Sequence, residues 1–328
     1  MRGHAIPRVF LNALLMGTGI AVLPVSSALA ERPRVYAITS ARVIVAPGQV
    51  VEEGTVVLRD GLIEAVGKDV KIPPDAVTVD GKGKTVHAGF IDACSEAGLA
   101  RSDGAAAAGG PPPPAGPAGG RTGVSQPPPG AVHPITRVRP EKRMLDQLEI
   151  SEKDDEKRRN MGFTAALAVP GPGIFRGTSA LISLGDGPVS ENIVRAEVAQ
   201  HIGFDHGSFG EGYPGSLMGA IAAIRQGFED AQRHQIWQAR YDADPKGMKR
   251  PDTLSAYEPM IRAVSRKIPV IFDAATPNNV VRSLALAREF RLDAIIVGSG
   301  ADYEVADAIK ASGRPLIVTL AFPDKPDL

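Results

Sequence analysis

The sequence contains a single cysteine, Cys94, among its 328 residues. One thiol excludes a disulfide within the chain and a zinc site built mainly from thiolates. The sequence also has no excess of either charge, because 37 lysine and arginine residues balance 37 aspartate and glutamate residues. A protein that binds nucleic acid through a broad basic surface carries a clear positive excess. We therefore expect no nucleic-acid partner.

The composition otherwise fits a globular protein with a buried core. Apolar residues make up 43% of the chain and charged residues 23%, which are ordinary values for a folded domain. The length is enough for about two domains. Beyond the first thirty residues, no apolar run is long enough to cross a bilayer. We expect no membrane span in the mature protein.

Residues 1–30 have the pattern of a secretory signal peptide. Arg2 and Arg8 give a positive start, an apolar stretch follows over residues 9–25, and residues 28–30 read Ala-Leu-Ala before Glu31. Small residues at this spacing are typical of the cleavage site. An uncleaved anchor helix is the alternative, but the apolar stretch is short for a membrane span. We expect an exported protein, periplasmic or extracellular.

Residues 31–87 read as β-structure. The clearest signal is a hairpin, in which Thr55–Leu58 and Leu62–Val66 flank the turn sequence Arg59-Asp60-Gly61. The strands in this region are too few and too short to build a large core of their own. They predict a small β-sandwich that packs on something else.

Residues 102–130 are of low complexity and rich in proline, glycine and alanine. They include two proline runs, Pro111–Pro114 and Pro127–Pro129, and almost no large apolar side chains. Such a segment cannot offset the entropy of ordering, so it predicts a disordered or semi-extended insert. The first proline run is also of the kind that proline-binding domains recognise, which is the alternative.

Strands and helices alternate toward the end of the chain. Strand starts lie about 22 to 24 residues apart, which is typical of right-handed βαβ units in a parallel sheet. Two earlier helices are expected over 214–235 and 254–264 from their apolar spacing. The alternating elements are predicted as strands at 269–273, 293–297 and 315–320, and as helices at 279–290 and 302–311.

Two further patterns bear on chemistry. His201 and His206, with Asp205 between them, fall in a stretch that reads as a loop. Surface or hydrogen-bonding histidines are expected there, and a metal role is the alternative. His234 is expected to face solvent on a helix. Residues 171–178 superficially resemble a phosphate-binding loop. They lack its lysine and precede another apparent strand, so they predict a β-loop instead.

Two runs, Gly61–Gly67 and Val79–Ala93, resemble the amidohydrolase superfamily, in character its secreted, imidazolonepropionase-like branch. In that family the second run leaves a small N-terminal β-sandwich and enters strand one of a (β/α)8 TIM-type barrel. The resemblance implies an α/β fold with a sandwich at 31–87 and a barrel at 88–328 that contains the insert at 102–130. The barrel is expected to be incomplete, with about seven strands, because the family's eighth strand and its aspartate base would lie beyond Leu328.

The resemblance also implies metal-ligand positions, and this sequence departs from them. The family's His-x-His after strand one reads Cys94-Ser95-Glu96, its strand-five histidine is Asp273, and its strand-six histidine is Ser299 at best. Residues two apart on a strand point to the same side, so Cys94 and Glu96 are candidates, with Asp273, for a rebuilt zinc site. In the alternative interpretation Cys94 is a small core residue and both acids are solvated or paired.

These departures leave two hypotheses open, and neither assigns a catalytic residue. In the first, the protein is a catalytically degenerate amidohydrolase without a cofactor. It would bind a ligand or partner, as a homo-oligomer or by pairing with an intact amidohydrolase. In the second, it is a metal-dependent hydrolase of non-peptide C–N bonds in amides, cyclic amides or dipeptides, with zinc or another divalent metal in the rebuilt site. A shared fold does not decide between them, since function resides in the site.

Overall fold

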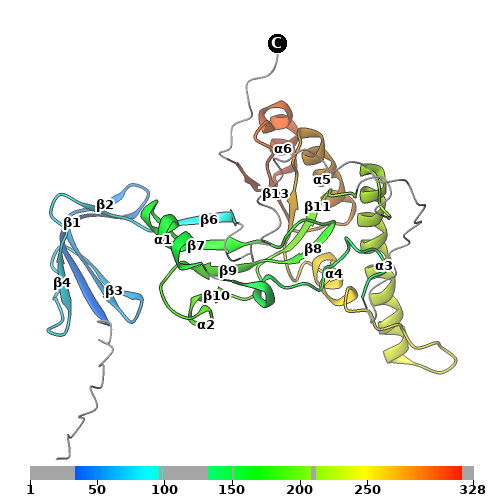
Figure 1. Ribbon diagram of the computed structural model, residues 1–328, viewed down its shortest axis with the longest axis horizontal. Coiled ribbons are helices and arrows are strands. Elements are labelled where there is room, and N and C mark those ends of the chain that lie inside the picture. The colour runs from blue at the N-terminus through cyan, green and yellow to red at the C-terminus, as the bar shows by residue number, and fades with distance from the viewer. Residues whose placement is uncertain (1–33, 96–97, 99–131, 150, 208–211, 320–328) are drawn as a thin grey trace, which may run out of the picture. The chain divides into compact units, whose positions relative to one another are not determined.

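The computed structural model describes residues 34–95, 98, 132–149, 151–207 and 212–319 (Figure 1). The predicted signal peptide, the whole of the predicted insert and Glu96 lie outside these residues. The chain divides into two compact units, with the boundary between Ala88 and Gly89.

The first unit is a single five-stranded sheet in the order β3-β2-β1-β4, with β5 paired to β1 beyond β4. Neighbouring residues Val56 and Val57 are both buried and belong to different apolar clusters, so both faces of the sheet are partly covered. The resemblance implies a sandwich, but the described residues of this unit form one sheet. Its strands are β1 (Val35–Ala46), β2 (Gln49–Arg59), β3 (Leu62–Gly67), β4 (Val77–Asp80) and β5 (Thr85–Val86).

The predicted hairpin is confirmed. Strands β2 and β3 are antiparallel, and Asp60 and Gly61 connect them with φ values of 50° and 78°. Two left-handed residues match the right-handed twist of the strands, which is why Asp-Gly favours this turn.

Gly61→Ala is expected to destabilise the first unit by about 1 kcal/mol, because an L-residue pays for the left-handed conformation. No atom would lie within 4 Å of the new Cβ, so the left-handed backbone conformation alone accounts for the expected loss of stability. Urea unfolding followed by circular dichroism measures the change. Gly67→Ala, at the end of the same hairpin and without a positive φ, is the control and should be close to neutral.

The second unit contains two sheets, and the described residues form no closed barrel. One sheet has the order β10-β9-β7-β6, and the other has the order β14-β13-β12-β11-β8. Strands β11 to β14 are parallel, while β8 is antiparallel to β11. The strands are β6 (Phe90–Ser95), β7 (Phe163–Ala168), β8 (Phe175–Thr178), β9 (Ala180–Ser183), β10 (Ile193–Arg195), β11 (Gln200–Gly203), β12 (Val270–Asp273), β13 (Ala294–Val297) and β14 (Leu316–Ile317).

The predicted βαβ rhythm is confirmed as β12-α5-β13-α6-β14. Thr276 caps α5 by accepting a hydrogen bond from the Asn279 backbone N–H at 3.2 Å, and Pro277 occupies its first turn. Gly313 ends α6 in the left-handed conformation, with φ 62°. The helices are α1 (Glu152–Asn160), α2 (Val189–Asn192), α3 (Leu217–Ala243), α4 (Tyr257–Val264), α5 (Pro277–Glu289) and α6 (Ala306–Ser312), with 3-10 turns at Met144–Gln147 and Asp302–Val305.

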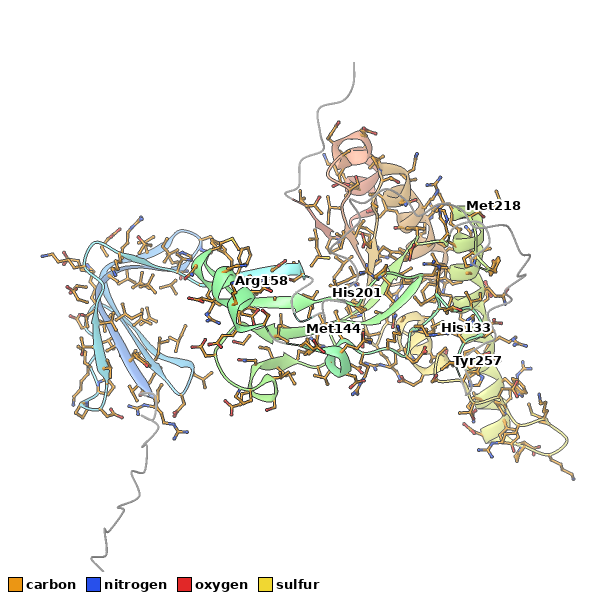
Figure 2. All side chains as sticks on the ribbon, in the orientation of Figure 1. His133, Met144, Arg158, His201, Met218 and Tyr257 are labelled. Atoms are coloured by element: carbon orange, nitrogen blue, oxygen red, sulfur yellow. The ribbon has the colours of Figure 1, made fainter. Side chains whose placement is uncertain are left out.

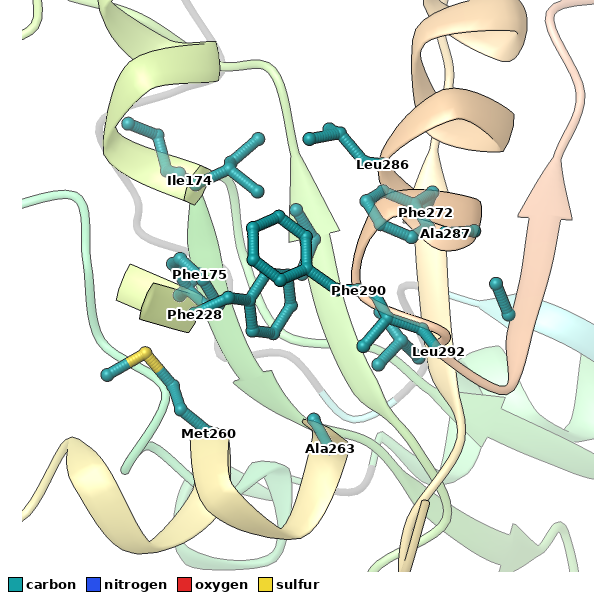
Figure 3. Packing of buried hydrophobic residues seen from close by; sticks show 14 of the residues in the cluster. Ile174, Phe175, Phe228, Met260, Ala263, Phe272, Leu286, Ala287, Phe290 and Leu292 are labelled. Carbon is teal, nitrogen blue, oxygen red and sulfur yellow. The ribbon is translucent and has the colours of Figure 1, made fainter. Parts of the chain in front are cut away.

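The parallel strands are buried on both faces. Along β12, Val270 and Phe272 belong to the core on the side of the sheet that α3, α4 and α5 cover, while Ile271 belongs to a cluster on the other side. Figure 1 shows these helices beside the strands. The helix side holds the larger core, in which the ring centroid of Phe228 lies 5.2 Å from that of Phe175 and 5.0 Å from that of Phe290 (Figure 3). On the other side is an inner cluster contributed by both sheets. Its buried members are Leu167, Val169, Ala199, Ile271 and Val297.

Helix α3 runs beyond the predicted end at residue 235, to Ala243. Its Trp237, the one tryptophan of the sequence, donates an indole hydrogen bond to the Lys249 carbonyl at 3.1 Å. That contact ties the segment that follows the helix back to it. Among the described residues, no helix combines the length and apolarity needed to cross a membrane.

Candidate functional site

An ion pair lies where the strand-five metal ligand was predicted. Arg176 on β8 donates from Nη1 to Asp273 Oδ2 at 2.7 Å, at the carboxyl end of β12. Arg176 also donates from Nε to the Gly171 carbonyl at 2.9 Å and from Nη2 to the Pro170 carbonyl. The Arg176 side chain is 11% exposed and its guanidinium is held by these bonds, and it neutralises the carboxylate it faces.

His201 lies on β11, paired with Gly177 of β8 and Ile271 of β12 (Figure 2). The residue is 1% exposed, and its Nε2 has no hydrogen-bond partner among the described residues. Burial, with a smaller contribution from the charge of nearby Arg176, lowers the pKa of His201 to about 3. The imidazole is therefore neutral at pH 7, and the prediction of a surface or hydrogen-bonding histidine in a loop is wrong.

Cys94 occupies the carboxyl-terminal part of β6 and is exposed, while its neighbour Ser95 is buried. The interpretation of Cys94 as a small core residue is therefore wrong, because Ser95 is the only buried residue of β6. The Cys94 backbone N–H donates to Asp92 Oδ1 at 3.3 Å. Its predicted co-ligand, Glu96, is outside the described residues.

Ser299, at the strand-six position, is engaged locally. Its hydroxyl donates to Asp302 Oδ1 at 3.0 Å, and its backbone N–H donates to the same oxygen at 2.8 Å. These bonds close the turn between β13 and the helical segment that follows, which gives Ser299 a structural role.

The described residues do not form the metal site that the resemblance implies, and its candidate ligand Glu96 lies outside them. Over the described ranges, no group of three histidine, cysteine, aspartate or glutamate side chains is arranged to hold a metal ion. Asp273 already faces a guanidinium at 2.7 Å. A divalent cation at this carboxylate would meet a fixed positive charge, which opposes its binding.

A cavity of about 240 Å³ lies beside Arg176, and its lining is strongly cationic. Four of its ten lining residues are basic, and the described residues that line it include no acid. We call this cavity the cationic pocket. It is lined by Thr136, Arg137, Arg139, Lys142, Gln147, Pro170, Gly171, Pro172, Phe175 and Arg176. Sequence reasoning missed it, although Arg137, Arg139 and Lys142 lie close together in the sequence and offered a signal.

Two of the remaining histidines have structural contacts. The ring of His234 stacks on Tyr257 with centroids 4.3 Å apart, so it is half-buried rather than solvent-facing as predicted. Burial lowers the pKa of His234. His206 Nδ1 lies 3.2 Å from the Gly207 carbonyl, a hydrogen bond of the kind expected for it.

The glycine-rich segment before β8 is a β-loop, as predicted. Residues 171–174 lead directly into β8, and the Ile174 N–H donates to the Arg137 carbonyl at 2.9 Å. Gly177 has φ 114° and lies against the Lys142 backbone. This loop and the segment 136–147 together form most of the cationic pocket.

Comparison with known proteins identifies the fold. No protein-family model and no curated protein matches the sequence. An amidohydrolase from Thermotoga maritima MSB8 is similar in structure, with a TM-score of 0.68 and 22% identity over 88% of this chain and 72% of that chain. A prolidase complexed with N-methylphosphonate-L-proline matches with a TM-score of 0.41 and 14% identity, over 87% and 66% of the two chains.

An N-acyl-D-glutamate deacylase from Bordetella bronchiseptica, complexed with zinc and a phosphonate inhibitor, has a TM-score of 0.36 at 14% identity. That match covers 86% of this chain and 57% of the deacylase. The Thermotoga structure shows that this chain has an amidohydrolase fold, and the resemblance read from the sequence is confirmed at that level.

Proposed function

We propose that this protein is an exported amidohydrolase-like protein that binds a ligand or partner and does not carry out metal-dependent hydrolysis. The observation that carries the proposal is the 2.7 Å ion pair between Arg176 and Asp273. It supports a site in which a guanidinium has taken the place of a metal at the strand-five carboxylate.

The chemistry of hydrolysis explains why this substitution matters. A catalytic zinc site needs about three protein ligands and an open position for the water whose pKa the metal lowers. Neutral imidazoles suit that role, because added anionic ligands reduce the Lewis acidity of the metal. Here the family's histidine positions carry Cys94, Glu96, Asp273 and Ser299, and two of these side chains are already engaged.

The architecture we infer follows the family. Parallel strands β11 to β14 and the inner cluster shared by both sheets support an incomplete TIM-type barrel of about seven strands. The N-terminal sheet would belong to a small sandwich, and the insert at 102–130 would be a disordered loop. Export would depend on the signal peptide at 1–30. The protein would carry out its binding role as a homo-oligomer or in a complex with an intact amidohydrolase.

Purified full-length protein supplied with zinc, manganese or cobalt is expected to show no turnover of amides, cyclic imides or dipeptides. The reason is that the carboxylate at the strand-five position is neutralised by Arg176 rather than free for a metal. Product release measured by chromatography checks the prediction, alongside metal content per chain.

The competing hypothesis of a rebuilt metal site makes the opposite prediction. It requires turnover by the wild type that is abolished in each of Cys94→Ala, Glu96→Ala and Asp273→Ala. Asp242→Ala, which removes an exposed carboxylate on α3, is the matched control and should leave such turnover unchanged. That combination of results would overturn the proposed function.

A further inference from the structure

We propose that the cationic pocket binds a small organic acid through its carboxylate group. The inference rests on the proposed binding role and names the class of ligand that would fill it. The pocket lies within the second unit, between the segment 136–147 and the loop that leads into β8.

Charge gives the first argument. Arg137, Arg139, Lys142 and Arg176 line the pocket, and their acidic partners are not among the described lining residues. Arg137 binds Asp205 at 2.7 Å and Arg176 binds Asp273 at 2.7 Å, while Arg139 lies 3.9 Å from Glu141. All four cations line the pocket wall, and no described lining residue carries a negative charge. An anion is the ligand that this wall favours.

Two of these cations are held rigidly before any ligand arrives. Arg139 is 12% exposed and donates from Nη1 to the carbonyls of His133, Ile135 and Val138 at 2.8, 3.1 and 2.8 Å. Arg176 is 11% exposed and is anchored by the Gly171 carbonyl. Binding groups that are already in place cost little entropy when they meet a ligand. The arginines therefore set the electrostatic field of the pocket.

Lys142 complements them. Its side chain is exposed, and no carboxylate within the described part of the chain pairs with it. An ammonium group on a flexible stem can move onto a bound carboxylate and form a charge-assisted hydrogen bond. We therefore assign Lys142 as the residue that makes the direct ionic contact with the ligand.

Size and apolar lining narrow the ligand to an organic acid. A volume of about 240 Å³ corresponds to roughly eight water molecules in the liquid, which suits a short carbon chain with one or two carboxylates. Pro170, Pro172 and Phe175 contribute apolar surface to the wall. Methylene groups would gain from burial against them. Inorganic phosphate has no carbon atoms to use that surface.

Arg176 connects the pocket to the ion pair described above. The same guanidinium lines the pocket and binds Asp273, so a bound carboxylate and Asp273 compete for one positive charge. Removing the charge of Asp273 should therefore strengthen binding of the acid.

Titration calorimetry of the full-length protein tests the proposal, with succinate as the probe and with succinamide and inorganic phosphate for comparison. We expect saturable binding of succinate that weakens as salt is raised, and weaker binding of the other two. Lys142→Met should weaken succinate binding by about tenfold or more, as the loss of one charge-assisted hydrogen bond implies. Lys153→Met, which removes an exposed charge from α1 outside the pocket, should have no effect, and Asp273→Asn should bind more tightly.

Absence of saturable succinate binding, equal binding of succinamide, tighter binding of phosphate, or an unchanged affinity in Lys142→Met would each overturn the proposal. Weaker binding in Asp273→Asn would contradict the role of Arg176. These results are independent of the hydrolysis assay. Failure to bind succinate leaves the absence of metal-dependent turnover intact, and turnover that depends on Cys94 and Asp273 would refute the proposed function without changing the affinity for succinate.

Discussion

Replacing Gly177 with alanine is expected to lower the free energy of unfolding of the second unit by about 3–5 kcal/mol. Gly177 has φ 114°, a conformation that an L-residue adopts only with strain. A Cβ built there would overlap the Lys142 carbonyl group, which is backbone and cannot rotate away. The chain would have to move Lys142, which breaks the 2.8 Å hydrogen bond from the Thr178 N–H to that carbonyl.

Urea unfolding monitored by circular dichroism measures this loss. Gly171→Ala is the matched control, because it lies in the same loop, has no positive φ, and would meet no atom within 4 Å. We expect it to change stability by less than about 0.5 kcal/mol, because the added methyl group would displace no neighbouring atom. Similar losses in the two variants would contradict the close approach between Gly177 and Lys142. If Gly177→Ala folds, its displaced Lys142 should also weaken succinate binding.

Acid is expected to destabilise the second unit through His201, by about 2.5 kcal/mol between pH 7.5 and pH 4.5. The pKa of His201 is about 3 in the folded chain, and an unfolded histidine titrates near 6.5. As the pH falls below about 6.5, His201 becomes protonated in the unfolded chain but stays neutral in the folded chain. Stability is therefore complete above that pH and is lost at about 1.4 kcal/mol per pH unit until the folded pKa is reached.

The contribution of His201 is measured by comparing the slope of unfolding free energy against pH in the wild type and in His201→Leu. His201→Leu replaces the imidazole with an apolar side chain of similar size on the inner face of the sheet, and so removes the titrating group. Burial also lowers the pKa of His133 and His234, so part of the acid sensitivity should remain in the variant. The difference between the slopes of the wild type and the variant is the contribution of His201. Parallel slopes would show that His201 is not buried as a neutral base.

Local signals in the sequence accounted for most of the second unit's regular structure. Helix α5 and strand β13 were predictable because Thr276 and Pro277 mark a helix start, and because the apolar run at 294–297 is long enough only for a strand. Strand β11 was missed. Its sequence, Gln200-His201-Ile202-Gly203, contains two polar residues and a glycine, and it is a strand because β8 and β12 pair with it on both sides.

The candidate site was less predictable than the fold. The resemblance pointed to Asp273, but nothing local indicates that Arg176, 97 residues earlier, would be its partner. Such a pair exists only after β8, β11 and β12 have come together. The exposure of Cys94 was likewise not predictable, because β6 has apolar residues on both faces and yet Ser95 is its only buried residue.

The contact between Trp237 and Lys249 also determines what optical experiments on this protein will report. Because the sequence holds one tryptophan, indole fluorescence follows the end of α3 and the segment tied to it, and it is silent about the five-stranded sheet before Gly89. Circular dichroism, in contrast, averages over both units. Coincident transitions in the two signals would therefore mean that the two units melt as one cooperative body, whereas a dichroic change without a fluorescence change would trace the separate melting of the N-terminal sheet.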